Sequence, residues 1–91
     1  HSVELLDGTL KKLDEWDRLG YNIILTSGRR ESMRFHTERQ LSEVGIIYDK
    51  LILGIGGGTR YIINDTKNDS DDPTCFAITV KRNEGIDNIK L

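Results

Sequence analysis

The strongest constraint on the fold is an apolar run that ends abruptly in polar residues. Residues 21–30 read Tyr-Asn-Ile-Ile-Leu-Thr-Ser-Gly-Arg-Arg, so two hydroxyls, a glycine and two arginines follow the apolar side chains. This pattern is typical of a buried parallel strand that carries polar groups to one end of a sheet. A second run, residues 61–63, ends in Asn64 and Asp65 in the same way. Because ligands bind beyond the carboxyl ends of the strands in an open α/β sheet, we expect the two tips to face one crevice.

Helical spacing of apolar residues flanks the first of these strands on both sides. The pattern predicts one helix over residues 9–19, ended by Gly20, and a second over residues 31–44, ended by Gly45. With a strand over residues 21–26 between them, and another strand to follow, this is the crossover unit of a parallel sheet.

Three further strands are predicted, over residues 49–53, 60–64 and 75–80. A polar loop without any apolar residue, residues 65–73, separates the last two. The order helix, strand, helix, strand, strand, strand predicts a single α/β domain over residues 1–91, a Rossmann-like three-layer sandwich with a mainly parallel sheet.

A helix stands first in this order, whereas an α/β domain of this kind normally starts with a strand on which the first helix packs. We therefore expect the N-terminal strand to be missing, which would leave backbone groups at a sheet edge unpaired. Either residues 1–6 or another chain must then pair there. The expectation is a homodimer, or aggregation, through the unpaired sheet edge.

Composition excludes several classes of protein. Ninety-one residues with 36% hydrophobic side chains make one small domain. Thirteen basic and fifteen acidic residues are interspersed and give a net charge of −2, so we expect no nucleic-acid binding. No apolar stretch approaches the ~20 residues of a membrane span. The single Cys75, between Thr74 and Phe76, predicts a small buried hydrophobe in a reducing compartment, and hence a cytoplasmic protein.

Two groups of residues carry candidate chemistry. Ser27, Gly28 and Arg29 lie between a strand and a helix N-terminus, where free backbone N–H groups and a hydroxyl suit a phosphoryl oxygen. The alternative is that Thr26 and Ser27 only cap the helix. Asp65 follows a strand tip, and such a carboxylate can bind magnesium through hard oxygen ligands.

A glycine-rich segment, residues 54–58, invites comparison with nucleotide-binding loops. Thr59 stands where the last glycine of G-x-G-x-x-G is needed, and a strand rather than a helix is predicted to follow. We therefore interpret the segment as a tight loop that lets the backbone approach a ligand or turn sharply.

Together these residues resemble a known pattern. Residues 23–29 resemble motif II of the haloacid dehalogenase superfamily, and residues 61–65 resemble its motif IV. The resemblance covers about residues 8–80 and implies a magnesium-dependent phosphohydrolase that acts on a small phosphorylated metabolite. It implies magnesium ligands at Asp65 and, by the Asp-x-x-x-Asp pattern, at Asp69.

The same resemblance implies how the phosphoryl group is held. The motif II hydroxyl falls on Ser27, with Thr26 as the alternative register. Motif III is a Lys or Arg upstream of motif IV that steadies the phosphoryl charge. Arg60 lies closest to that place, and Lys50 is the second candidate.

The chain departs from the family pattern at motif I, a strand that ends in Asp-x-Asp-x-Thr and supplies the aspartate nucleophile. Asp7, Gly8 and Thr9 match its end, but Leu5 stands at the position of the nucleophile. Either this is a degraded motif I, or the true motif lies upstream. In both cases we expect no turnover by this chain. The alternative function is a non-catalytic domain of the same fold that binds a ligand or a partner protein.

Overall fold

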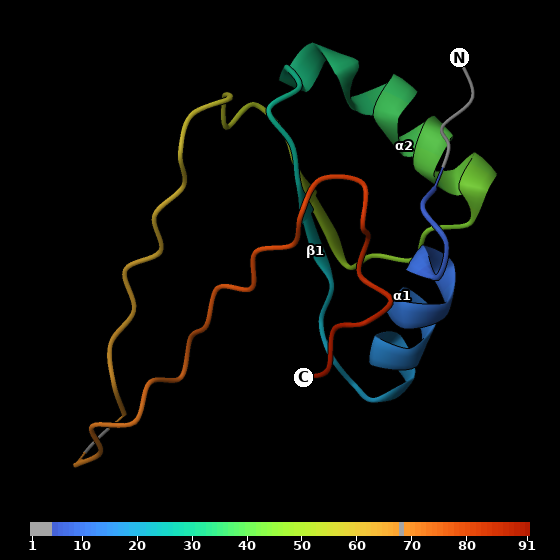
Figure 1. The fold of residues 1–91 in the computed structure, drawn as a ribbon. Coiled ribbons are helices and arrows are strands. Elements are labelled where there is room, and N and C mark those ends of the chain that lie inside the picture. The colour runs from blue at the N-terminus through green and yellow to red at the C-terminus, as the bar shows by residue number, and fades with distance from the viewer. Residues whose placement is uncertain (1–4, 68) are drawn as a thin grey trace.

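A small α/β body and a long extended arm make up the chain (Figure 1). The computed structural model describes residues 5–67 and 69–91. We call residues 59–67 and 69–80 the arm. The elements of the body, in chain order, are helix α1 (Thr9–Arg18), strand β1 (Ile24–Thr26), the 3-10 helix η1 (Glu31–Met33), helix α2 (Arg34–Val44) and strand β2 (Lys50–Ile52).

The two strands form a parallel pair joined by a helical crossover, as the sequence predicts for this part of the chain. The paired residues are Ile24 with Lys50, Leu25 with Leu51, and Thr26 with Ile52. Asp49 extends the pairing at its start, because the Ile23 N–H donates to Asp49 Oδ2 at 2.6 Å and the Asp49 N–H donates to the Ile23 carbonyl at 2.7 Å. The larger Rossmann-like sandwich stays a prediction.

Both predicted helices are confirmed, and their ends lie where the glycines are. The backbone of Gly45 caps α2 with φ of 80°, a left-handed conformation that glycine adopts without steric cost. Gly20 follows α1 with φ of 91°. No helix in the described ranges is long and apolar enough to cross a bilayer.

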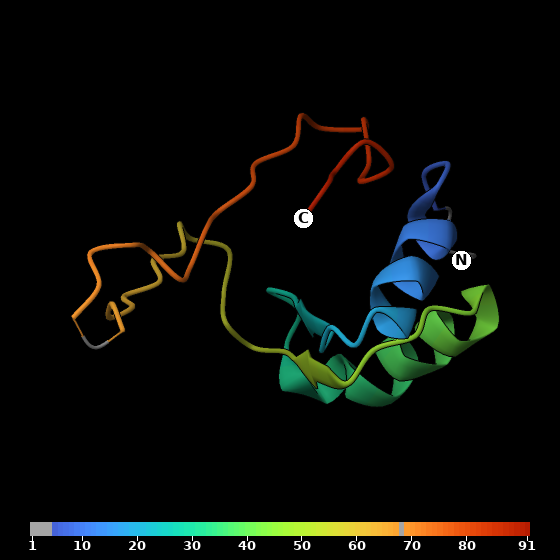
Figure 2. The ribbon, with the colours of Figure 1, turned by 90° about the horizontal axis from the view of Figure 1, so that it is seen from below.

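The core of the body is small. Its buried apolar side chains are Leu13, Ile23 and Leu53. Helix α2 covers one face of the sheet (Figure 2), and the side chains that it buries are the polar ones of Thr37 and Gln40. Buried polar side chains are normally hydrogen-bonded, so we expect Thr37 and Gln40 to have a hydrogen-bond partner within the body.

The arm differs from the predictions. No strand forms over residues 60–64 or 75–80, and both segments are extended and exposed. Tyr61, Ile62 and Ile63 are 84%, 74% and 98% exposed. The prediction that Cys75 is buried is also wrong, since its side chain is exposed. The physical reason is that a strand needs a hydrogen-bonding neighbour, and none of the described residues pairs with these segments.

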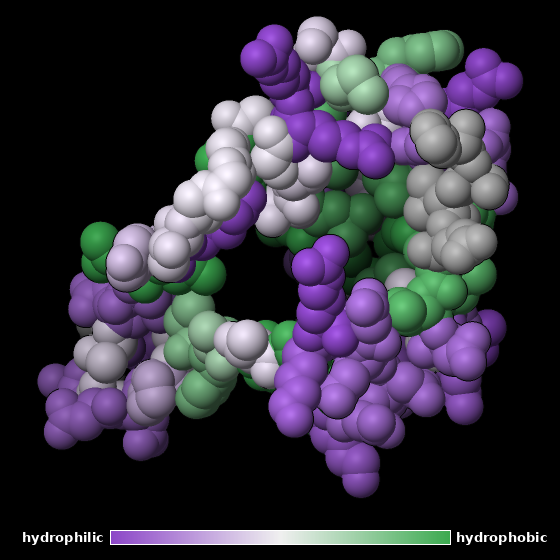
Figure 3. Space-filling view, turned by 45° about the horizontal axis from the view of Figure 1, so that its top comes forward, coloured by the Kyte–Doolittle hydropathy of each residue, from purple (hydrophilic) through white to green (hydrophobic). Residues whose placement is uncertain are grey.

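The arm leaves the body and returns to it as two limbs. The Asn64 side-chain amide donates to Thr74 Oγ1 at 2.9 Å and so links the limbs across the loop. Figure 3 shows the arm standing apart from the body across an open gap, beside a hollow in which hydrophobic side chains gather. The arm therefore leaves apolar surface uncovered on both sides of the gap.

Candidate functional site

Two loops meet at the carboxyl end of the sheet, one after β1 and one after β2. The Ser27 N–H donates to the Ile52 carbonyl at 3.0 Å, which carries the strand pairing one residue further. The Gly54 N–H donates to the Arg29 carbonyl at 2.7 Å. The loop after β1 (residues 27–30) and the glycine loop (residues 54–58) are therefore hydrogen-bonded neighbours, and we call the two together the loop cluster.

The contact between the loops is close enough to require glycine. A Cβ added to Gly28 would lie 2.7 Å from the Gly56 carbonyl oxygen, a distance that real Cβ atoms do not adopt. The same Gly56 carbonyl accepts a hydrogen bond from Arg60 Nη2 at 2.8 Å, and Gly58 accepts one from Arg60 Nη1 at 2.9 Å. The Gly56 carbonyl thus contacts both the loop after β1 and the guanidinium of Arg60, the predicted phosphate-binding cation.

Ser27 is half-buried, and its hydroxyl organises the loop. Ser27 Oγ accepts a hydrogen bond from the Arg29 N–H at 3.1 Å. No side-chain hydrogen bond caps η1, whose first flanking residue is Arg30, so helix capping by Thr26 or Ser27 is not found. A serine hydroxyl that accepts one bond still has its own proton to donate. Ser27 can therefore donate to an anion without leaving its place, whereas Thr26 is an exposed residue of β1.

Arg29 has a structural role that the sequence interpretation missed. Its Nη1 donates to Thr37 Oγ1 at 3.1 Å and to Gln40 Oε1 at 2.7 Å, which anchors the loop on α2. The three side chains border a cavity of about 300 Å³ between α2 and the sheet. The sequence carries one indication of this contact: Thr37 and Gln40 are three residues apart, so their side chains share one face of the helix.

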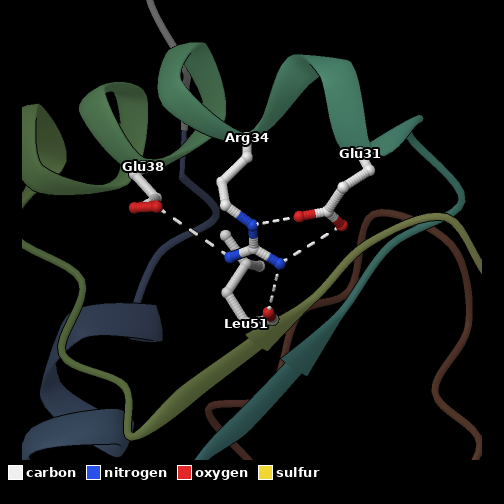
Figure 4. A network of polar contacts seen from close by, with 4 residues as sticks. All are labelled: Glu31, Arg34, Glu38 and Leu51. Carbon is white, nitrogen blue, oxygen red and sulfur yellow. Dashed lines mark hydrogen bonds and ion pairs between the residues drawn. The ribbon is translucent and has the colours of Figure 1, made fainter.

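Arg34 joins α2 to β2 (Figure 4), and this network too was not foreseen. Its guanidinium bonds both carboxylate oxygens of Glu31, lies 3.9 Å from Glu38 Oε1 and donates to the Leu51 carbonyl at 3.0 Å. The hydrogen bond from Arg34, assisted by its charge, lowers the pKa of the Glu31 carboxyl below its ordinary value of 4.5. The same bond raises the pKa of Arg34. Helix α2 is therefore held on the sheet by a hydrogen bond from the Arg34 guanidinium to a backbone carbonyl of β2, and the ion pairs of Arg34 stay within η1 and α2.

Asp65 lies in the arm rather than in the loop cluster. It borders an open cavity of about 660 Å³ between the two limbs, and Arg60 borders the same cavity. Arg60 is therefore the residue that connects the loop cluster with the surroundings of Asp65. Asp69 is exposed and has a positive φ of 57°, a turn conformation. Within residues 5–67 and 69–91, no three His, Cys, Asp or Glu side chains gather as metal ligands would.

The remaining candidates lie elsewhere. Lys50 is the first residue of β2, so it stands at the end of the sheet opposite Ser27, which leaves Arg60 as the motif III candidate. Asp7 is exposed in the turn before α1. The neighbouring Gly8 is packed against the Asp87 side chain, which places this turn beside the C-terminal segment.

Comparison of the chain with family models, with curated proteins and with solved structures finds no match in any of the three.

Proposed function

We propose that the loop cluster binds the phosphoryl group of a small phosphorylated metabolite, in a cytoplasmic domain of the haloacid dehalogenase type. The observation that carries the proposal is the shared contact at the Gly56 carbonyl. This contact puts Gly28, in the loop after β1, and the guanidinium of Arg60 next to the same oxygen atom.

Charge favours an anion at this place. The Arg60 guanidinium has five N–H donors, and its hydrogen bonds go to neutral carbonyls. Among the described residues, no carboxylate lies within ion-pair distance of Arg60. A phosphoryl oxygen would accept charge-assisted hydrogen bonds from this cation and a hydrogen bond from the Ser27 hydroxyl.

Magnesium enters the proposal through Asp65, with Asp69 as a further ligand. The carboxylates of the described residues do not gather into a preformed centre. Magnesium is often held by one or two carboxylates together with substrate phosphate oxygens and water, so a single protein ligand predicts weak binding.

A non-catalytic ligand-binding domain is the second candidate, and Leu5 favours it. A side chain without a nucleophilic atom stands where the family has its aspartate. Positioning and electrostatic groups can still hold a phosphoryl group when the covalent step is absent. Binding without turnover is therefore the expected behaviour of this chain.

Titration with inorganic phosphate, followed by amide NMR shifts, tests the binding proposal. We expect saturable shifts at Ser27, Gly28 and Gly56. Arg60→Gln should weaken binding by about ten- to a hundredfold, because a charge-assisted hydrogen bond contributes roughly 1.5–3 kcal/mol. Lys67→Gln is the matched control for loss of one positive charge and should change the affinity little.

A second pair of variants tests the geometry of the loops. Gly28→Ala must push the glycine loop away, whereas a Cβ at Gly57 meets nothing within 4 Å. Gly28→Ala should therefore weaken phosphate binding and Gly57→Ala should not. Equal affinities for the two variants, or no shifts in the loop amides of the unmodified chain, would overturn the proposed site.

An aryl phosphate assay with magnesium separates the two candidate functions. We expect no turnover, and weak magnesium binding that Asp65→Ala removes. Turnover that is lost with a chelator and in Asp65→Ala would show that a nucleophile is present after all, and would favour the phosphatase over the non-catalytic domain.

A further inference from the structure

The two outer edges of the sheet differ in whether a side chain bonds their backbone groups. At β2 the outward carbonyl of Leu51 accepts a hydrogen bond from Arg34, so a charged side chain occupies that edge. Charged side chains on an edge strand oppose pairing with another chain. Among residues 5–67 and 69–91, no charged side chain bonds the outer edge of β1 in this way.

The pairing register shows which backbone groups of β1 are open. Ile23 accepts from the Asp49 and Lys50 N–H groups and Ser27 donates to Ile52, so these odd-numbered residues turn their backbone toward β2. In a parallel strand alternate residues turn the other way, which directs the N–H and C=O groups of Ile24 and Thr26 outward. None of the described residues makes a backbone hydrogen bond to them from outside the sheet.

An apolar cavity of about 390 Å³ lies beside β1. Side chains of α1, of the segment before β1 and of the C-terminal segment enclose it together with the strand. Its lining consists of Leu13, Trp16, Tyr21, Asn22, Ile23, Ile24, Leu25, Ile86 and Leu91. A strand added along β1 would bring every second one of its side chains toward this cavity. The added strand therefore needs apolar residues at those alternate positions.

The arm contains a segment with these properties. Tyr61, Ile62 and Ile63 are extended, and no backbone hydrogen bond joins them to any described residue. β-branched and aromatic side chains of this kind favour strands. The described part of the chain therefore holds both a strand edge without a backbone partner and a strand-forming segment without one.

We propose that two copies of the chain associate by reciprocal strand addition, with residues 61–64 of each copy paired along β1 of the other. A second copy is the occupant that satisfies both features at once, because each copy offers the edge that the other needs. Such an exchange closes on itself about a two-fold axis and leaves no open end.

The proposed pairing covers apolar surface on both sides of the contact. Each copy contributes its own exposed Tyr61, Ile62 and Ile63 to one pairing and its half-exposed Ile24 to the other. An aromatic side chain contributes on the order of 150 Å² when it is covered, so these residues supply a sizeable part of the roughly 800 Å² that each partner contributes to a standard interface. The net charge of −2 per copy opposes association only weakly.

Sedimentation velocity over a range of concentrations tests the association. We expect a concentration-dependent monomer–dimer equilibrium for the unmodified chain. Ile63→Lys should weaken it at least tenfold, because it places a charge in the added strand. Phe35→Lys is the matched control, since Phe35 is a similarly exposed apolar residue on α2, away from the arm, and its replacement should leave the equilibrium unchanged.

A paramagnetic label locates the contact. One sample of the chain, at natural isotope abundance, carries a nitroxide on the single Cys75 and is mixed with ¹⁵N-labelled chain that has no nitroxide. The nitroxide should broaden the amide signals of Ile24 and Thr26 in the ¹⁵N-labelled copies. Ile63→Lys in the spin-labelled copy should abolish this broadening. A chain that remains monomeric overturns the proposal. So do polydisperse aggregates, a dimer equally disrupted by Phe35→Lys, or a dimer in which the β1 amides keep their intensity.

Discussion

Residues 23–26 and residues 61–64 have nearly the same character, yet only the first become strand. Each segment joins apolar side chains to a polar end. In the body Ile23 is buried and β1 forms, whereas in the arm Ile63 is almost completely exposed and no ladder forms. The comparison teaches that strand propensity is realised only where another segment supplies hydrogen bonds and covers a side-chain face.

The body supplies β1 with contacts that the arm lacks. Asp49 and β2 provide backbone partners along one edge. Helix α2 covers one face of the sheet, and its Arg34 donates to the Leu51 carbonyl at the outer edge of β2 (Figure 4). Among the described residues, the two limbs of the arm are joined by the hydrogen bond from Asn64 to Thr74, and the remaining hydrogen bonds of the arm are local. Stability is therefore expected to be concentrated in the body.

The largest contrast should come from truncation of one isoleucine in each segment. Ile23→Ala removes a buried side chain and should lower the free energy of unfolding by about 2–4 kcal/mol. Ile63→Ala should change it by less than about 0.5 kcal/mol in the monomer. Urea denaturation at a protein concentration that keeps the chain monomeric measures both. Similar losses for the two variants would mean that residues 61–64 are packed in solution.

A smaller contrast is expected between the polar contacts of the two regions. Asp49→Ala leaves the Ile23 N–H without its carboxylate acceptor and should cost about 1–3 kcal/mol. Asn64→Ala removes an exposed hydrogen bond and should cost less than about 0.5 kcal/mol. Thermal unfolding of both variants, with hydrogen exchange at the Ile23 amide, provides the measurement. Unchanged protection of that amide in Asp49→Ala would contradict the assigned bond.

The smallest effect should come from Glu31, which supports Arg34 at the protected edge of β2. The pKa of Glu31 is lowered in the folded chain, so its contribution is present above the ordinary value of 4.5 and is lost as the pH falls through the lower folded value. Glu31→Gln should therefore melt slightly below the unmodified chain at pH 7. The two should converge as the pH falls below 4.5 and through the lower value of the folded chain. A difference in melting temperature that persists at acidic pH would show that Glu31 does not act through its charge.

Local pattern was sufficient for the helices and for the first pair of strands. The apolar spacing before Gly20 and Gly45 predicts helices that the structure contains. Ser27 lies in the loop after β1, and the side chain of Arg60, which the family resemblance selected, bonds the Gly56 carbonyl beside that loop; the roles of both residues stay predictions. The same reasoning predicted strands in the arm and did not foresee that Arg29 would bond Thr37 and Gln40.

Whether a prediction from the sequence was correct depended on how far along the chain the hydrogen-bond partners of the residue lie. A helix satisfies its backbone within its own segment, so residues 9–18 and 34–44 could be determined by the sequence alone. A strand and an arginine fork take partners from residues far along the chain, as Ile23 does from Asp49 and Arg34 from Leu51. Only the tertiary structure decided which of two similar apolar runs found such partners, because propensity is a property of the segment and pairing is a property of its neighbours.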